Sequence, residues 1–336
     1  MSGTRMPAET DPHERTLVAW PTERRRAFWE GHVDAARDAW AELVRAIAPH
    51  EPVTVVVDVG ELAGATARLG AEPNVDLVEE PIDDCWIRDS GPVVVRGPDG
   101  IRGAVQFGFN AWGGLVEPWD HDATIASRLA GHLGLPVRPA PFVLEGGAVA
   151  VDGDGLVVTT ERCLLHPNRG PLPDGSPRTA GALEALLAEW LGAERVLWLR
   201  DGLADDTDTD GHVDNVVALP RPGVALLQGC EDPDDPDAAT AGDNRTRLAD
   251  AGLEVVELPV LPRTERFGRV VEVPYANLYA ANGVVVVPVT GHAADADALD
   301  AIAGCYPGRS VVPIDGATFA FGGGGPHCAT QQVPAA

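Results

Sequence analysis

The C-terminal end of the chain carries the residues best suited to covalent chemistry. A run of four glycines, residues 322–325, leads into Pro326, His327 and Cys328. Consecutive glycines let other groups approach the backbone closely, because no side chain is in the way. A thiol held in such a place is well suited to act as a nucleophile, so the sequence predicts that Cys328 is reactive.

Histidine and carboxylate residues stand in three further polar motifs. His212 and Asp214 belong to Thr-Asp-Gly-His-Val-Asp-Asn, Asp89 belongs to Trp-Ile-Arg-Asp-Ser-Gly-Pro, and Glu145 belongs to Leu-Glu-Gly-Gly. In an extended segment His212 and Asp214 would point to the same face. A thiolate nucleophile with a histidine acid/base is the leading interpretation of this set.

Three carboxylates beside one thiol indicate the charge of the substrate. Several buried negative charges are costly unless a cation pairs with them. A planar guanidinium satisfies carboxylates in bidentate fashion, so the substrate is predicted to be a small cationic guanidine.

Structural roles remain open for several of these residues. Asp89 could instead pair with Arg88 or cap a turn, Glu145 could begin a strand, and His212 could be structural. Trp86 and Trp112 are either core residues or cation-π walls. The four other cysteines lie among apolar residues and are interpreted as packing residues: Cys85, Cys163, Cys230 and Cys305.

The composition excludes several classes of protein. The chain has 336 residues, 51 acidic and 25 basic residues and a formal net charge of −26, and all of its basic residues are arginine. Without lysine it can build neither a Walker-type phosphate loop nor a pyridoxal Schiff base. The strong acidity argues against nucleic acid as a partner. No apolar run is long enough for a membrane span and no signal peptide is evident, so we expect a soluble cytoplasmic protein with reduced thiols.

Short strands, hairpin turns and helices are expected to position these motifs. Alternating or continuous apolar runs predict strands at residues 53–59, 93–95, 148–151, 156–160, 216–219, 224–227 and 284–289. Turn residues at 98–100, 152–155 and 220–223 predict hairpins. Helices are expected to begin near Gly31, Asp122, Thr179, Asp237 and Ala293, the last four about 57 residues apart.

One polar motif falls in each repeated unit, the fifth being that of Asn277. If five units pack around an axis, their equivalent loops meet at the centre. We therefore expect a single pseudo-symmetric α/β domain over residues 1–336. The alternative is two domains joined near the proline-rich segment 167–177.

The motifs resemble those of the agmatine deiminase family, which belongs to the guanidine-modifying superfamily and is related to the bacterial-type peptidylarginine deiminases. The similarity runs from residue 6 to residue 334 and rests on seven motifs in the family's order. They are Met6-Pro-Ala-Glu9 with Pro12-His-Glu14, residues 83–92, Gly108 to Gly114, Leu144 to Gly147, Cys163 to Arg169, Thr209 to Asn215 and Gly322 to Pro334.

The resemblance implies a five-bladed α/β propeller of the pentein type, built from ββαβ units. It also implies hydrolysis of agmatine to N-carbamoylputrescine and ammonia, a step of polyamine biosynthesis, without metal or cofactor. Cys328 would be the nucleophile, His212 the acid/base, Asp89 and Asp214 the guanidinium clamps, and Glu145 a support for His212. The substrate-binding residues expected in or beside these motifs are Trp86, Trp112, Asp84, Arg88 and Gly323.

Two departures from the family pattern bear on these expectations. The family commonly has tryptophan at Thr10, near the substrate tail, and an aliphatic residue at Pro326. The alternatives are a deiminase of another guanidine (arginine, peptidyl-arginine or an alkylguanidine), an amidinotransferase, or a non-catalytic binding protein of the same fold. Homo-oligomerisation is compatible with the sequence but is not specified by it.

Overall fold

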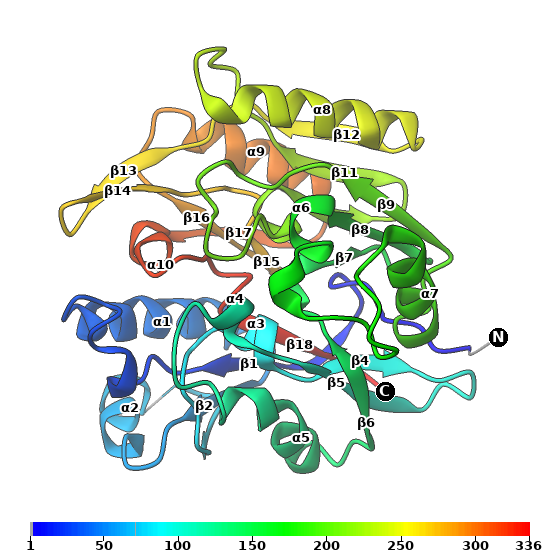
Figure 1. Cartoon of the computed structure of the whole chain (residues 1–336). Coiled ribbons are helices and arrows are strands. Elements are labelled where there is room, and N and C mark those ends of the chain that lie inside the picture. Colours follow the sequence, from blue (N-terminus) through cyan, green and yellow to red (C-terminus); the bar gives the residue numbers. More distant parts are fainter. Residues whose placement is uncertain (1–2, 71) are drawn as a thin grey trace.

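The computed structural model describes residues 3–70 and 72–336. In that part of the chain, the strands form six sheets in a mixed α/β architecture (Figure 1). The strands are β1 His13–Ala19, β2 Val53–Val57, β3 Val75–Glu79, β4 Val93–Arg96, β5 Arg102–Gly108, β6 Val137–Val143, β7 Ala150–Val151, β8 Leu156–Thr160, β9 Arg195–Leu199, β10 Val217–Arg221, β11 Val224–Gln228, β12 Glu254–Leu258, β13 Arg263–Arg266, β14 Arg269–Glu272, β15 Tyr279–Ala281, β16 Val284–Val289, β17 Ser310–Asp315 and β18 Thr330–Pro334.

Helices connect the strands, and most of the longer ones lie toward the outside of the molecule in Figure 1. They are α1 Val33–Ile47, α2 Leu62–Leu69, α3 Ile87–Ser90, α4 Ala111–Gly114, α5 Asp122–His132, α6 Glu161–Leu164, α7 Ala180–Trp190, α8 Pro236–Asp250, α9 Asp295–Cys305 and α10 Ala317–Phe321. Short 3₁₀ helices occur at Glu23–Arg25, Gly146–Ala148, Pro167–Arg169 and Val213–Asn215.

Four of the sheets repeat one pattern of strands, in the orders β4-β5-β6, β7-β8-β9, β10-β11-β12 and β15-β16-β17. In each, the first two strands form an antiparallel hairpin, and the third pairs in parallel with the second after a helix. The helices are α5, α7, α8 and α9, and they begin close to the predicted positions. The hairpin-plus-helix unit is therefore confirmed.

The two ends of the chain complete the remaining large sheet, with the order β18-β1-β2-β3. Strand β18 pairs antiparallel with β1, where Leu17 opposes Gln331, and β1 pairs parallel with β2 across α1. The last strand thus takes the place that a hairpin strand has in the other units. The predicted strand at 148–151 is shortened to β7, because residues 146–148 form a 3₁₀ turn.

Amphipathic spacing explains why the helices form where they do. In α1 the buried residues include Val33, Ala36, Trp40, Val44 and Ile47, which recur every three or four positions and so share one face. That face packs against the strand β16. Helix α8 begins with Pro236 at its first position, and the Asp235 side chain accepts a hydrogen bond from Asp237 N–H at 2.9 Å.

The polar motifs occupy the same place in every unit. Asp89, Glu145, His212, Asn277 and Cys328 each lie a few residues before the first strand of a sheet: β4, β7, β10, β15 and β18 respectively. Equivalent loops of separate units therefore carry the chemically active side chains.

Candidate active site

A narrow cavity forms where these loops meet. Residues from four of the motifs line it, together with residues of the neighbouring loops: Trp86, Asp89, Trp112, Leu115, Asp208, Thr209, His212, Asn215, Gly323 and Cys328. Cys328 and Asp89 are 239 positions apart in the sequence and share this cavity. The fold thus brings the predicted nucleophile, histidine and carboxylates to one place.

Cys328 is almost entirely buried, with 6% of its surface exposed. Its Sγ accepts a hydrogen bond from Asn277 Nδ2 at 3.1 Å and donates one to Asp214 Oδ2 at 3.4 Å. Burial, and then the charges of Asp214 and Asp89, raise the pKa of the thiol well above its usual range. In the absence of a bound cation, the thiol is therefore protonated at neutral pH.

The glycine run permits a close approach of the loop to the aromatic wall of the cavity. A Cβ atom on Gly324 would lie 2.6 Å from Trp86 Cζ3 and 3.1 Å from Cys328 Cβ. Because real Cβ atoms do not come that close to a ring carbon, any side chain here would displace either the ring or the nucleophile. The predicted close approach beside Cys328 is confirmed.

Asp89 is buried and held by two donors from different loops. Its Oδ1 accepts from Gly147 N–H at 2.8 Å, and its Oδ2 accepts from Trp112 Nε1 at 2.9 Å. Trp112 adopts a left-handed backbone conformation, with φ 55°, that is uncommon outside glycine. Burial raises the pKa of Asp89, although the positive charge of His212 opposes this effect.

His212 faces Asp89 on one side of its ring, with 3.9 Å between Nδ1 and Asp89 Oδ2. Gly147 packs against this arrangement, because a Cβ there would lie 2.6 Å from His212 Nδ1. Burial favours the neutral imidazole, but the negative charge of Asp89 outweighs this effect and holds the pKa of His212 well above its usual value. The ring is therefore protonated at neutral pH and can donate a proton.

Asp214 has one carboxylate oxygen committed and one available. Its Oδ2 accepts from His327 Nδ1 at 2.8 Å, whereas its buried Oδ1 has no hydrogen-bond partner among the described residues. Burial by itself would raise the pKa of Asp214. The hydrogen bond from His327 and the charge of that ring have the larger combined effect and lower the pKa below its usual value, so the group is ionised. An ionised, buried oxygen without a donor can accept a substrate N–H.

Glu9 and His327 form a half-buried charge network that sequence reasoning did not assign. His327 Nε2 lies 3.0 Å from Glu9 Oε2, and Arg88 Nη2 donates to the same oxygen at 2.9 Å. Burial would raise the pKa of Glu9, but His327 and Arg88 lower it to about 2. Both residues belong to motifs that carry the family resemblance, and this was the signal in the sequence that they matter. Nothing in the sequence indicates that Glu9 and His327, which are far apart along the chain, form a pair.

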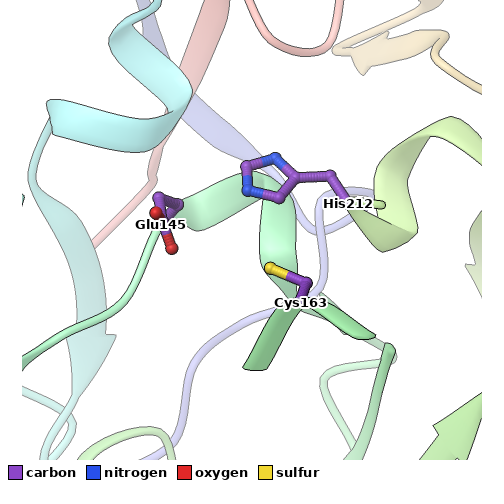
Figure 2. Close-up of side chains that lie close together, drawn as sticks. All are labelled: Glu145, Cys163 and His212. Carbon is purple, nitrogen blue, oxygen red and sulfur yellow. The ribbon is translucent and has the colours of Figure 1, made fainter. Parts of the chain in front are cut away.

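Glu145 lies beside His212 and is fully buried. Its Oε1 accepts from Arg169 Nε at 2.9 Å. Cys163, interpreted from the sequence as a packing residue, lies here too: ligand atoms of Glu145, Cys163 and His212 all fall within 4.8 Å of one another (Figure 2). The apolar neighbours of Cys163 in the sequence concealed this contact with His212.

The five expected substrate-binding residues divide into two groups. Trp86, Trp112 and Gly323 line the cavity. Asp84 and Arg88 are not among the described residues that line it: Asp84 Oδ2 accepts from Arg25 Nε at 2.9 Å, and Arg88 Nη1 donates to Gln332 Oε1 at 2.5 Å. The charge of Asp84 is paired with Arg25 and that of Arg88 with Glu9, and the contact of these two residues with substrate stays a prediction.

The two departures from the family pattern lie at different places. Thr10 lines a small separate cavity with Glu9, Arg88 and His327, and not the cavity of Cys328. Pro326 is buried, and its carbonyl accepts from Thr330 Oγ1 at 2.9 Å, while His327 N–H donates to Asn277 Oδ1 at 3.1 Å. The glycine loop is thus fixed on both sides of Pro326.

A wider cavity of about 410 Å³ adjoins the narrow one and shares Asp208, Asn215 and Gly323 with it. Its wall carries more acidic than basic side chains: Asp205, Asp206, Asp208 and Glu272 against Arg269. Asp208 borders both cavities, and burial together with the charge of Asp206 raises its pKa. The entrance to Cys328 is therefore an acidic vestibule.

Comparison with known proteins identifies the family. The model of the Porphyromonas-type peptidyl-arginine deiminase family matches residues 5–334. The agmatine deiminase of Pseudomonas aeruginosa is 36% identical over 99% of this chain and 96% of its own length. The chain belongs to the agmatine deiminase family.

Solved structures of the family have the same fold. The agmatine deiminase of Enterococcus faecalis superposes with a TM-score of 0.90 and 32% identity, over 99% of this chain and 96% of that chain. The family resemblance found in the motifs is confirmed, and so is the pentein type of the mixed α/β fold. In addition, no helix of the described residues is long and apolar enough to cross a membrane.

Proposed function

We propose that the chain is an agmatine deiminase, which hydrolyses the guanidinium group of agmatine to N-carbamoylputrescine and ammonia. One observation carries the proposal: the Cys328 thiol lies in a narrow cavity with His212 and the buried Asp89, donates a hydrogen bond to the buried carboxylate of Asp214, and adjoins an acidic vestibule. Asp214 Oδ1 has no hydrogen-bond partner among the described residues and can accept a guanidinium N–H group. The Asp89 carboxylate can accept another. Trp86 and Trp112 flank the same space.

In the first step, the Cys328 thiol loses its proton to solvent when agmatine binds, and the thiolate attacks the guanidinium carbon. The bound cation offsets the charges of Asp89 and Asp214 and so lowers the pKa of the thiol, which means that the substrate helps to generate its own nucleophile. The C–N bond then breaks, and protonated His212 donates its proton to the departing ammonia. A covalent thiouronium remains on Cys328.

In the second step, water resolves the thiouronium. His212, now neutral, removes a proton from the water, and the hydroxide adds to the carbon. The C–S bond breaks, the proton of the added hydroxyl passes to the departing sulfur, and the ureido product leaves Cys328 as the thiol and His212 protonated. Glu145 supports His212 from the side of the ring that faces away from Asp89.

The vestibule favours agmatine over arginine. Agmatine ends in an ammonium group, which the acidic wall around Asp208 attracts, whereas arginine adds a carboxylate that the same wall repels. An amidinotransferase would need an amine to resolve the intermediate in place of water. A binding protein without catalysis would have no use for the combination of Cys328, His212, Asp89 and Asp214.

At the level of the whole chain, we propose a five-bladed propeller formed by one domain over residues 1–336. Five sheets of three or four strands occur in the described part of the chain, and each presents one motif residue before its first strand. Five equivalent loops that share one centre are what a propeller requires. We further propose a cytoplasmic enzyme that acts without a cofactor on a small-molecule substrate.

A panel of guanidines tests the assignment. Ammonia and ureido product are measured for agmatine, arginine, peptidyl-arginine and an alkylguanidine, with and without a competing amine. We expect kcat/KM for agmatine to exceed that for arginine by at least about 100-fold, given the charge difference in the vestibule. A preference for arginine would overturn the substrate, and a new guanidine formed from the amine would indicate amidino transfer.

A further inference from the structure

The side of His212 that faces away from Asp89 carries a second group of potential ligands. With Nδ1 toward Asp89, Nε2 is directed to the other side, where the Cys163 sulfur and the Glu145 carboxylate are turned toward the ring (Figure 2). The three side chains come from different units: Glu145 precedes β7, Cys163 is in α6 and His212 precedes β10. All three are buried.

Two of the polar atoms in this group lack hydrogen-bond partners. His212 Nε2 and Glu145 Oε2 have none among the described residues, although both are inaccessible to solvent. A buried polar atom without a partner costs about 1–3 kcal/mol. Two such atoms directed at one point, beside a thiol, indicate a place that can hold a further group.

We propose that Glu145, Cys163 and His212 form an inhibitory binding site for a thiophilic divalent metal ion such as Zn²⁺. A carboxylate, a thiolate and an imidazole are all ligands of zinc, and three protein ligands with one water are common in its open sites. The ligand atoms lie within 4.8 Å of one another. Tetrahedral zinc needs them about 3.3–3.6 Å apart, which small side-chain rotations supply.

The charges around the site suit a divalent cation. On binding, the Cys163 thiol and the Nε2–H of the His212 imidazolium each release a proton to solvent, and the sulfur and Nε2 lone pairs that are freed go to the metal. The thiolate and the Glu145 carboxylate then neutralise the ion. Arg169, the nearest buried cation, stays paired with Glu145 Oε1 and with Asp210.

Binding there would stop catalysis without contact to Cys328. The inference about inhibition rests on the proposed acid/base role of His212, because a metal on Nε2 fixes the ring and prevents Nδ1 from cycling a proton. Agmatine would still enter the cavity, so the inhibition should be non-competitive with agmatine. A chelator should reverse it.

Cobalt(II) absorption tests the site without relying on turnover. Co²⁺ is titrated into the purified full-length protein, the thiolate-to-cobalt charge-transfer band is recorded, and Zn²⁺ is then added to displace it. The same titration is made with Cys163→Ser, Cys163→Ala and Cys328→Ser, and circular dichroism checks the folding of each variant. Zinc inhibition is measured relative to each active variant's own metal-free rate.

We expect one Co²⁺ per chain with a thiolate band in the wild type and in Cys328→Ser, and no band in the two Cys163 variants. The zinc concentration for half-inhibition should rise at least about tenfold in Cys163→Ser. A band that survives in both Cys163 variants, or that is lost in Cys328→Ser, would overturn the site. Because the band needs no catalysis, its absence would be distinguishable from a failure of the deiminase assignment.

Discussion

Opposite charges alternate around Cys328 over short distances. Asp214 lies between the thiol and His327, and His327 lies between Asp214 and Glu9. Burial and the charge of Arg88 lower the pKa of His327. The carboxylates of Glu9 and Asp214 have the larger effect and raise the pKa above its usual value, so His327 remains cationic. This chain of charges keeps Asp214 ionised and fixes its orientation beside the nucleophile. Glu9 and His327 are therefore positioning residues for the proposed reaction.

The network predicts a pH-dependent effect of Glu9→Gln on stability. The pKa of Glu9 is lowered from 4.5 to about 2, so its stabilisation is present above pH 4.5 and is lost as the pH falls toward 2. At pH 6 the variant should lose on the order of 3 kcal/mol in the free energy of unfolding. Urea unfolding of the wild type and the variant between pH 6 and pH 3 measures the gap, which is the difference between their free energies of unfolding.

The same substitution at the exposed Glu231 provides the control, for which the gap should stay within about 0.5 kcal/mol. A Glu9→Gln gap that does not narrow below pH 4.5 would contradict the network.

Asp208→Asn tests the charge at the mouth of the cavity. Removing the carboxylate should raise KM for agmatine about tenfold with little change in kcat, because in the proposed binding mode Asp208 would face the ammonium tail and not the reacting carbon. Activity on arginine should be unchanged or higher. Asp205→Asn, on the more exposed part of the same wall, should have a smaller effect. An equal loss of activity toward both substrates would argue against a role in specificity.

Residue types and motif settings were enough to predict Cys328, His212, Asp89 and Asp214 as one site. They were not enough for Cys163, whose neighbours in sequence are apolar while its neighbour in space is His212. Nor were they enough for the ion pairs of Asp84 with Arg25 and of Arg88 with Glu9, because these pairs join distant segments.

Among the structural elements, the loops before the first strand of each sheet position the side chains of the site. Turn residues and apolar runs predicted the hairpins β4–β5, β7–β8 and β10–β11, since these signals are local. The 3₁₀ helices at Gly146–Ala148 and Val213–Asn215 were not predicted. Such turns depend on tertiary hydrogen bonds, for example that from Gly147 N–H to Asp89, rather than on local propensity.

Gly324→Ala should disrupt the loop that carries Cys328. The added methyl would meet Trp86 and the Cys328 Cβ, so the nucleophile or the ring must move. We expect kcat/KM for agmatine to fall by about 100-fold, since small displacements at reacting groups have effects of that size. Steady-state kinetics and thermal unfolding measure the two consequences.

Gly131→Ala in α5 is the matched control, because a Cβ there would meet no atom within 4 Å. It should keep full activity, with stability unchanged or raised by up to about 1 kcal/mol. Full activity of Gly324→Ala would show that the close approach is dispensable.

At the scale of the whole molecule, the C-terminal strand and the acidic surface matter most. The repeat length predicted four of the units, but the pairing of β18 with β1 joins the two ends of the chain and left no local signal. That pairing fixes the segment that carries Cys328 against the first unit. The chain as a whole has a net charge of −26, and the proposed substrate is a cation.

The charge predicts that salt slows the capture of agmatine. Long-range attraction of a cation to an acidic protein is screened over about 10 Å at 0.1 M salt. Between about 0.01 M and 0.3 M salt, kcat/KM should therefore fall several-fold while kcat stays constant. A kcat/KM that is independent of salt would assign the acidic surface to solubility alone.

In the proposed mechanism, Cys328 forms a covalent bond to the guanidinium carbon of agmatine. Rapid mixing with agmatine, acid quenching and mass spectrometry of the digested protein test it most directly. We expect an adduct on the Cys328 peptide with the mass of agmatine minus ammonia, and neither adduct nor ammonia release in Cys328→Ala. Undiminished ammonia release by Cys328→Ala, or an adduct on another residue, would contradict it.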